Sequence, residues 1–272
     1  MVEKTFHEIE HEAWSKRANY YDALFRNISA QAIDDILDSL GSLQGKRHLD
    51  VACGTGHLVA AASARGAFSE GIDFAQPMID VARTLYPNFC FRVADAADLP
   101  YDDNSQNAVT CSFGLSHMEN PQAGVDEAFR VLKVGGHFAF TLWCGDENSS
   151  GLYAILKTAL EKYVKDDYTL PEQWVRLRFA DKQVCEVITR QAGFSEPVFK
   201  ILPIVWHIES AQQLVDLFDK LSVRTKMIID RQPRAIQQQI YEDILSEAEA
   251  RRINGVISLA WPALLTVVQK PG

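Results

Sequence analysis

The chain has 272 residues, 47% of them hydrophobic and 23% charged, which is enough for one domain with an insertion or for two domains. Its formal net charge of -9 disfavours a polyanionic partner, so we expect no nucleic acid among its partners. No run approaches the ~20 apolar residues of a membrane helix, and residues 1–14 lack the apolar segment of a signal peptide, which predicts a cytoplasmic protein without a membrane span.

Apolar residues at helical spacing alternate with short, continuously apolar runs along the first half of the chain. The helical stripes lie at residues 33–40, 78–85 and 125–132. The apolar runs are typical of strands buried on both faces of a parallel sheet, and they lie at residues 47–52, 69–73, 89–93, 108–113 and 138–143. This order predicts an α/β fold, in which ligands bind at the carboxyl ends of the strands.

The second half of the chain has a different order of elements. A helical pattern covers 183–192, the last two strands are expected at 197–207 and 256–268, and a long helical stretch covers about 210–253. A helical connection of that length is too long for a hairpin and is expected to form a lid. The predicted organisation is a helical cap at 1–45, a core at 46–207 and 254–272, and a helical lid insertion at 208–253.

A glycine-rich turn follows the first expected strand, in the run Leu49-Asp50-Val51-Ala52-Cys53-Gly54-Thr55-Gly56. Such a turn brings bare backbone close to a ligand. The run Gly71-Ile72-Asp73 ends the second strand in a carboxylate, where a nucleotide ribose is held by its hydroxyls. The glycine spacing fits neither G-x-G-x-x-G nor a P-loop. Together these features predict a nucleotide-like cofactor without a phosphate cradle.

This turn resembles the first motif of class I S-adenosylmethionine-dependent methyltransferases, and the pattern is most similar to that of the ubiquinone- and menaquinone-biosynthesis type acting on small molecules. The resemblance implies a Rossmann-like fold: a seven-stranded, mostly parallel sheet with helices on both faces and the helical lid between the last two strands. It also implies S-adenosyl-L-methionine as the cofactor, with Asp50 attracting its cationic amino group. Ala52 stands where the family has its first glycine, and alanine keeps the turn if its φ is negative.

Later segments match further motifs of this family in the same order, at 71–78, 92–100, 107–117 and 130–138. The resemblance implies that Asp73 accepts from both ribose hydroxyls. In the same way, Asp95 would accept from the adenine amino group and Ala96 N–H would donate to the ring. Trp14, Ala18 and Tyr21 resemble the family's W-x-x-x-A-x-x-Y pattern. The expected cofactor-binding residues are Tyr21, Asp50, Ala52, Gly54, Gly56, Asp73, Phe74, Met78, Ala94, Asp95, Ala96, Ser112 and His117.

Each of these residues also has a purely structural interpretation. An aspartate after a strand is often only a helix N-cap or a turn former, which applies to Asp73 and Asp95. Phe74 and Met78 could belong to the core, and Tyr21 could anchor its helix on the sheet. The five cysteines contain no C-x-x-C pair, so no zinc site, other metal site or disulfide is expected.

The implied reaction places an O, N or C atom of a small acceptor in line with an activated methyl group, and a base is needed only if that atom must lose a proton. His117 is the first candidate for this base and His207, beside Glu209, is the second; a structural role is open for both. Aromatic residues of the later chain favour an apolar or aromatic acceptor: Trp174, Phe179, Trp206 and Phe218.

The main functional hypothesis is a small-molecule methyltransferase, working as a monomer or a homodimer. The first alternative is an S-adenosylmethionine-binding protein that does not transfer methyl groups, because the sequence shows no unmistakable catalytic residue. The second is a nicotinamide oxidoreductase, which rests on fold analogy and is disfavoured by the glycine spacing.

Overall fold

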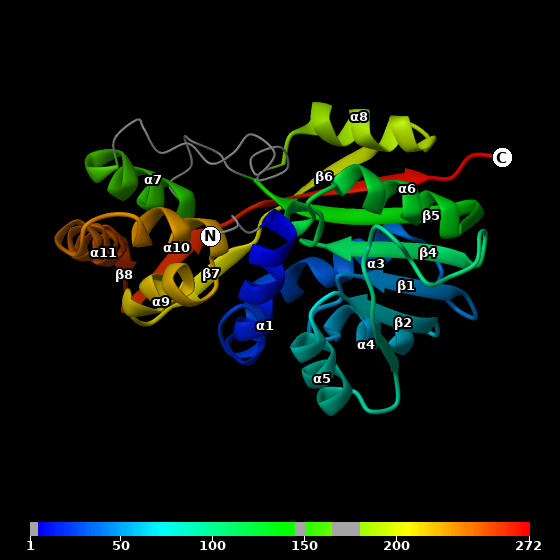
Figure 1. The fold of residues 1–272 in the computed structure, drawn as a ribbon, viewed down its shortest axis with the longest axis horizontal. Coiled ribbons are helices and arrows are strands. Elements are labelled where there is room, and N and C mark those ends of the chain that lie inside the picture. The colour runs from blue at the N-terminus through cyan, green and yellow to red at the C-terminus, as the bar shows by residue number, and fades with distance from the viewer. Residues whose placement is uncertain (1–4, 145–150, 165–179) are drawn as a thin grey trace.

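A seven-stranded sheet forms the centre of the computed structural model, which describes residues 5–144, 151–164 and 180–272 (Figure 1). Its strands, in spatial order, are β3 (Cys90–Val93), β2 (Phe68–Asp73), β1 (Arg47–Val51), β4 (Gln106–Ser112), β5 (Leu132–Trp143), β10 (Ala263–Gln269) and β6 (Val198–Leu202). The first five are parallel to one another, whereas β10 is antiparallel to both β5 and β6. This sheet confirms the mostly parallel, Rossmann-like architecture expected from the sequence.

Helices cover both faces of this sheet, because residues along each strand alternate between two cores. In β4, Ala108 contributes to one core, shared with α3 and α4, and Val109 contributes to the other, shared with α6 and α8. The helices before the insertion are α1 (Phe6–Leu24), α2 (Arg26–Ser29), η1 (Ala30–Ala32), α3 (Ile33–Ser39), α4 (His57–Ala64), α5 (Gln76–Leu85), η2 (Leu115–His117), α6 (Pro121–Val131), α7 (Leu152–Tyr163) and α8 (Lys182–Ala192).

The two strands expected at 197–207 and 256–268 are each divided in two by a proline, which corrects the prediction. Pro203 separates β6 from β7 (Val205–Ile208). Pro262 separates β9 (Val256–Ala260) from β10. A proline cannot donate a hydrogen bond to the sheet ladder, so both strands of the pair are interrupted at neighbouring places. Beyond the prolines, β7 and β9 pair with each other and, with β8 (Arg252–Ile253), form a separate antiparallel sheet.

The helices between β7 and β8 are α9 (Gln212–Lys220), α10 (Val223–Asp230) and α11 (Arg234–Glu249), in the segment where the helical insertion was predicted. Figure 1 shows these helices, together with α7, gathered beyond one end of the seven-stranded sheet. The insertion meets the N-terminal helix, because α9 packs on α1 and Arg17 Nε donates to the Lys220 carbonyl at 2.7 Å. No helix in the described ranges is long and apolar enough to cross a membrane.

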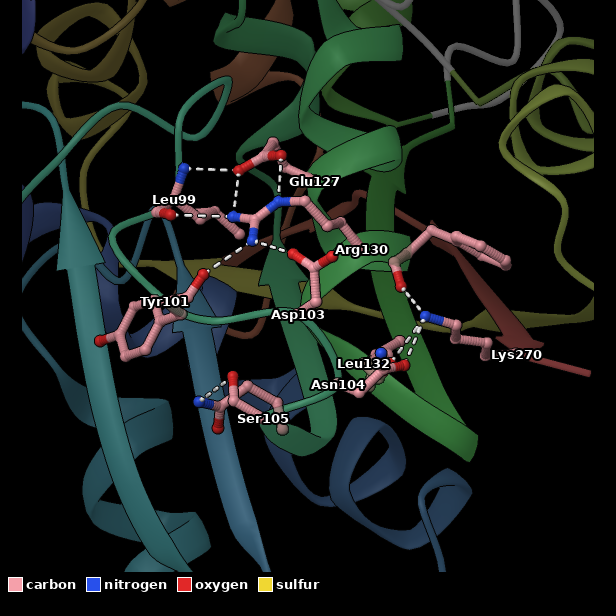
Figure 2. A network of polar contacts seen from close by, with 11 residues as sticks. Leu99, Tyr101, Asp103, Asn104, Ser105, Glu127, Arg130, Leu132 and Lys270 are labelled. Atoms are coloured by element: carbon pink, nitrogen blue, oxygen red, sulfur yellow. Dashed lines mark hydrogen bonds and ion pairs between the residues drawn. The ribbon is translucent and has the colours of Figure 1, made fainter.

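A network centred on Arg130 fixes the loop that leads from β3 to β4 (Figure 2). The guanidinium of Arg130 donates to the carbonyls of Leu99 and Tyr101 at 2.9 and 2.8 Å, and it forms an ion pair with Glu127 at 2.6 Å. Lys270 Nζ donates to two carbonyls at the junction of α6 and β5, 2.8 and 2.9 Å away. The loop is therefore held on α6, and this fixes the position of residues 94–97 at the end of β3.

Candidate active site

A cavity of about 220 Å³ opens at the carboxyl ends of β1, β2, β3 and β4, where ligands bind in open α/β sheets. The helix α1 provides one wall of it, through His7, Trp14 and Tyr21. Most of the expected cofactor-binding residues line this cavity, namely Tyr21, Ala52, Gly54, Asp73, Phe74, Met78, Ala94, Asp95, Ala96, Ser112 and His117. The structure therefore brings together side chains that lie on five different segments of the sequence.

The glycine-rich turn passes through three residues in the left-handed region: Ala52 at φ 56°, Gly54 at 52° and Gly56 at 86°. The condition under which alanine would keep the turn, a negative φ, is therefore not met at Ala52. A left-handed conformation costs a non-glycine residue roughly 1–2 kcal/mol, because Cβ approaches the following carbonyl. Gly56 lies outside the cavity lining, and a Cβ there would be 2.6 Å from the Phe91 ring, so its bare backbone serves packing.

The carboxylate of Asp73 joins the glycine-rich turn to the end of β2. One oxygen accepts from Gly54 N–H and the other from Ala75 N–H, each at 2.9 Å. Burial raises the pKa of Asp73 to about 6, and the two backbone hydrogen bonds act against that shift. Each oxygen keeps a lone pair for a further donor, so the two oxygens fit a pair of neighbouring hydroxyl groups such as those of a ribose.

Asp50 lies under the same turn and lines a smaller pocket beside the main cavity. Tyr21, Ala52 and Ser112 line both the pocket and the cavity. Thr110 Oγ1 donates to Asp50 Oδ1 at 2.6 Å. Burial raises the pKa of Asp50 to about 7, and the hydrogen bond from Thr110 acts against that shift. A buried carboxylate with a raised pKa gains from a cationic partner, which fits the expected contact with an amino group.

A chain of buried polar groups behind Asp50 is not apparent from the sequence. His48 is fully buried, with Nε2 2.9 Å from Thr110 Oγ1 and Nδ1 2.7 Å from Ser69 Oγ. Because Thr110 gives its proton to Asp50, Nε2 donates to Thr110 and Nδ1 accepts from Ser69. Burial lowers the pKa of His48 to about 3, so the ring is neutral. This chain fixes the direction in which Thr110 donates.

The residues expected around an adenine lie at the outer part of the cavity. Asp95 is exposed, and its Oδ1 accepts from Ala97 N–H at 2.9 Å, which shapes the loop after β3. Met78 is buried and Phe74 is half-buried, while the imidazole of His7 meets the Phe74 ring edge-on at 5.7 Å. Met78 and Phe74 pack against their neighbours and also line the cavity, so their structural role is observed and their binding role stays a prediction.

Tyr21 closes the cavity over the glycine-rich turn. Its Cε1 lies 3.7 Å from the place where a Cβ on Gly54 would be, so the ring covers the turn directly. Burial raises the pKa of Tyr21 to about 12, which keeps the phenol neutral. The ring also packs on Trp14 and Phe25, so Tyr21 both anchors α1 and forms part of the wall.

The two candidate bases are far apart in the structure. His117, in η2 after β4, lines the cavity and its Nδ1 is 3.0 Å from Oε2 of Glu10. His207 is exposed on β7, in the separate sheet, where its Nδ1 is 2.9 Å from Ser258 Oγ, and it is not part of the cavity lining. The structure therefore supports a site role for His117 and offers none for His207. Glu10 is a residue that the sequence did not indicate.

An aromatic wall forms the part of the cavity away from Asp73 and Asp95. It consists of Phe25, Phe113 and Trp143, and the rings of the last two stack at 3.9 Å. Phe113 has φ 60°, an unusual conformation for a bulky residue, and strained backbone of this kind is typical of functional sites.

The aromatic residues expected from the sequence are not those of this wall. Trp206 and Phe218 are buried in the core, and Trp174 and Phe179 lie outside the described residues. No residue of 208–253 lines the cavity within the described part of the chain, so closure by the helical insertion stays a prediction. The division of the chain into cap, core and lid also stays a prediction.

Comparisons with known proteins agree with this geometry. Residues 49–140 match the family model described as a methyltransferase domain. The chain is 42% identical over 118 residues to the demethylmenaquinone methyltransferase of Clavibacter sepedonicus, which covers 42% of this chain and 45% of the relative. It is 33% identical over 135 residues to the ubiquinone biosynthesis O-methyltransferase of Alkalilimnicola ehrlichii, which covers 48% of this chain and 54% of the relative. The matches thus span about half the length of these relatives.

A solved structure extends the similarity to the whole fold. The phosphoethanolamine N-methyltransferase 2 of Haemonchus contortus, in complex with S-adenosyl-L-methionine, aligns with a TM-score of 0.63 over 100% of this chain and 61% of that chain. The sequence identity is 16%, so this likeness concerns the fold alone.

Proposed function

We propose that this chain methylates an O, N or C atom of a small apolar or aromatic molecule. Residues 49–140 match the methyltransferase domain model, and the motifs resemble the S-adenosylmethionine-dependent class. The observation that carries the proposal is the position of Asp73, Asp95 and the glycine-rich turn around one cavity at the strand ends. The cytoplasmic location, the monomeric or homodimeric state and the absence of a nucleic-acid partner stay predictions.

The residues of the cavity fit S-adenosylmethionine, which supplies a methyl group that is already activated on a sulfonium. Asp73 would hold the ribose hydroxyls with the free lone pairs of its carboxylate. Asp95 and the Ala96 N–H would hold the adenine, between Phe74 and Met78. On the other side of Asp73, the turn at Ala52 to Gly54 would pack against the methionine part, and the cationic amino group would satisfy the buried charge of Asp50.

The aromatic wall supports an apolar or aromatic acceptor. A planar ring can pack against Phe113 and Trp143, and such aromatic contacts add to the gain from apolar burial. The names of the two relatives, which refer to menaquinone and ubiquinone, favour a quinone-type ring for this chain. Because the matches cover about half of each relative, the ring type is part of the proposal.

Positioning would supply most of the catalysis. Transfer from a sulfonium requires the acceptor atom to lie behind the methyl group and water to be kept out, which are entropic and environmental effects. The helix α1 contributes to both, because Trp14 and Tyr21 cover the cavity from one side.

Isothermal titration with S-adenosylmethionine and S-adenosylhomocysteine tests the cofactor part of the proposal. We expect micromolar binding that is lost in Asp73→Ala and strongly weakened in Asp73→Asn, which keeps the shape of the side chain. Asp80→Ala is the matched control, because Asp80 is exposed on α5 and does not line the cavity. A wild-type protein that binds neither molecule, or equal affinities of wild type and Asp73→Ala, would contradict the proposal.

Formation of S-adenosylhomocysteine tests the transfer itself. Acceptors for the assay are catechol, reduced 1,4-naphthoquinone and non-aromatic amines as a contrast. Turnover with the aromatic compounds supports the proposal, whereas cofactor binding without turnover on any acceptor supports the alternative of a non-transferring protein. Tight binding of NADH in place of both sulfur compounds would support the oxidoreductase alternative.

A further inference from the structure

A carboxylate–histidine pair lies beside the cavity and joins α1 to η2. Glu10 on α1 is fully buried. Its Oε2 accepts from Trp14 Nε1 and from His117 Nδ1, each at 3.0 Å. The rings of Trp14 and His117 meet edge-on, with centroids 4.9 Å apart, and both line the cavity. Glu10 and His117, which are 107 positions apart in the sequence, thus form one partly buried cluster at the edge of the site.

The hydrogen bond to Glu10 decides which ring nitrogen of His117 is free. An ionised carboxylate only accepts hydrogen bonds, so Nδ1 of His117 carries the proton that it donates to Glu10. In the neutral ring the lone pair is then on Nε2. Because Nδ1 is occupied by Glu10, Nε2 is the nitrogen available to a molecule in the cavity.

The burial of Glu10 favours a positive charge on His117. The second carboxylate oxygen, Oε1, is buried and has no hydrogen-bond partner among the described residues. A buried carboxylate with so few donors is costly, and a cation at hydrogen-bond distance reduces that cost. A proton on Nε2 of His117 would place a cation at hydrogen-bond distance from this buried carboxylate, while the imidazole itself is 32% exposed and open to the cavity.

We propose that His117 accepts the acceptor's proton on Nε2 during methyl transfer and that Glu10 is the residue that positions it for this role. The inference rests on the proposed methyl transfer and applies to acceptors with an O–H or N–H group. The electron pair of that bond forms the new bond to the methyl carbon, and the proton passes to Nε2. The electron pair of the former carbon–sulfur bond stays on sulfur, and Glu10 keeps its hydrogen bond to Nδ1 of His117.

Several other charged groups surround the pair and act on it in different directions. Asp73, at the end of β2, interacts electrostatically with His117, and this interaction acts against the rise that burial gives the pKa of Asp73. Arg17, on α1, interacts with Glu10 and is itself held by the Lys220 carbonyl. Arg224, on α10, donates to the Ser116 carbonyl and so fixes the turn that carries His117. Among these groups, Glu10 is the one that contacts the imidazole.

The protonation pattern of His117 is a test that needs neither cofactor nor acceptor. Histidine-selective ¹⁵N labelling of the full chain at pH 8 reports it, and the His117→Asn variant assigns the signals. We expect a protonated Nδ1 and an unprotonated Nε2 in the wild type. Glu10→Leu removes the acceptor and should move the proton mainly to Nε2, and Glu10→Gln should give a mixture. The second variant keeps the test valid if the first does not fold.

A matched control is Glu12→Gln, which makes the same change on the same helix at an exposed carboxylate paired with Lys16. It should leave the His117 signals unchanged. A wild-type His117 with a protonated Nε2 would overturn the proposal. So would spectra of both Glu10 variants that are identical to the wild-type spectrum.

Kinetics separate positioning from a merely structural role of Glu10. With catechol as the acceptor, we expect kcat to fall about 10- to 100-fold in Glu10→Gln, which is less than the ~10²–10⁴-fold of a general base. The affinity for S-adenosylhomocysteine should stay within about twofold of the wild type. A loss confined to KM or to cofactor affinity would overturn the proposal. If the wild type shows no turnover with any acceptor, the proposed function fails, and the NMR result still decides whether Glu10 sets the tautomer.

Discussion

Asp50 is expected to make the cofactor-free protein less stable as the pH rises, and Asp50→Asn is expected to weaken that dependence. The side chain is 2% exposed, and burial raises its pKa from 3.8 to about 7. Because the pKa is higher in the folded than in the unfolded chain, the folded state binds the proton more tightly. The associated stability is present in full below about pH 4 and is lost as the pH rises to about 7.

The size of this effect follows from the pKa difference. About three pKa units correspond to about 4 kcal/mol at about 1.36 kcal/mol per unit. About 2–3 kcal/mol of this is expected to be lost between pH 5 and pH 8, because part is already lost below pH 5. Asp73, whose pKa burial raises to about 6, adds a similar dependence to wild type and variant alike.

Urea unfolding between pH 5 and pH 8 measures the difference between the two proteins. We expect the free energy of unfolding to fall with pH by about 2–3 kcal/mol less in Asp50→Asn than in the wild type. An unpaired amide proton in the variant would lower its free energy of unfolding by the same amount at every pH. The difference in pH dependence between the two proteins would therefore stay the same. The control is Asp102→Asn, at an exposed position, which should follow the wild type. Parallel curves for wild type and Asp50→Asn would refute the reasoning.

Two further variants test the turn and the aromatic wall. Ala52→Gly should stabilise the protein by up to about 1 kcal/mol, since relief of the left-handed alanine exceeds the added freedom of the unfolded chain. Urea unfolding measures the stability of this variant and of its control. The control Ala60→Gly, inside α4, should instead destabilise the protein by about 1 kcal/mol. Equal losses of stability in Ala52→Gly and Ala60→Gly would show that Ala52 is not strained. Trp143→Leu should raise KM for an aromatic acceptor about tenfold, because it removes the ring that stacks on Phe113. Steady-state kinetics and titration check this, and a change in cofactor affinity with an unchanged KM would contradict it.

The sequence predicts which residues gather at one cavity, because their positions at the strand ends are encoded locally. Asp73 ends one short apolar run and Asp95 lies two residues after the next, and parallel strands bring such positions to one edge of the sheet. Asp73 and Asp95 thus reach the same cavity although the sequence separates them by 22 positions. The sequence does not predict the φ of Ala52, because this angle depends on the path of the whole turn and not on the residue type.

The acceptor side is less accessible to sequence reasoning, because its residues meet only in the folded chain. Glu10 and His117 come from α1 and η2, and neither local pattern indicates the other. Glu10 does lie on the helix face that Trp14 and Tyr21 define, because it is four positions before Trp14 and Tyr21 is seven positions after Trp14, and this spacing was the available signal. Pro203 and Pro262 were also visible, since a proline inside an expected strand indicates an interruption.

The position of α1 couples the cover of the site to its chemistry. This helix carries the rings of Trp14 and Tyr21 over the cavity and also carries the carboxylate that holds Nδ1 of His117. If α1 moves away to admit a molecule, water enters and the imidazole loses its partner in the same motion. Under the proposed role of His117, proton transfer would then require α1 in the position seen here, where its rings cover the cavity. For a cofactor that carries a reactive sulfonium, such an interlock protects the methyl group from being lost to water.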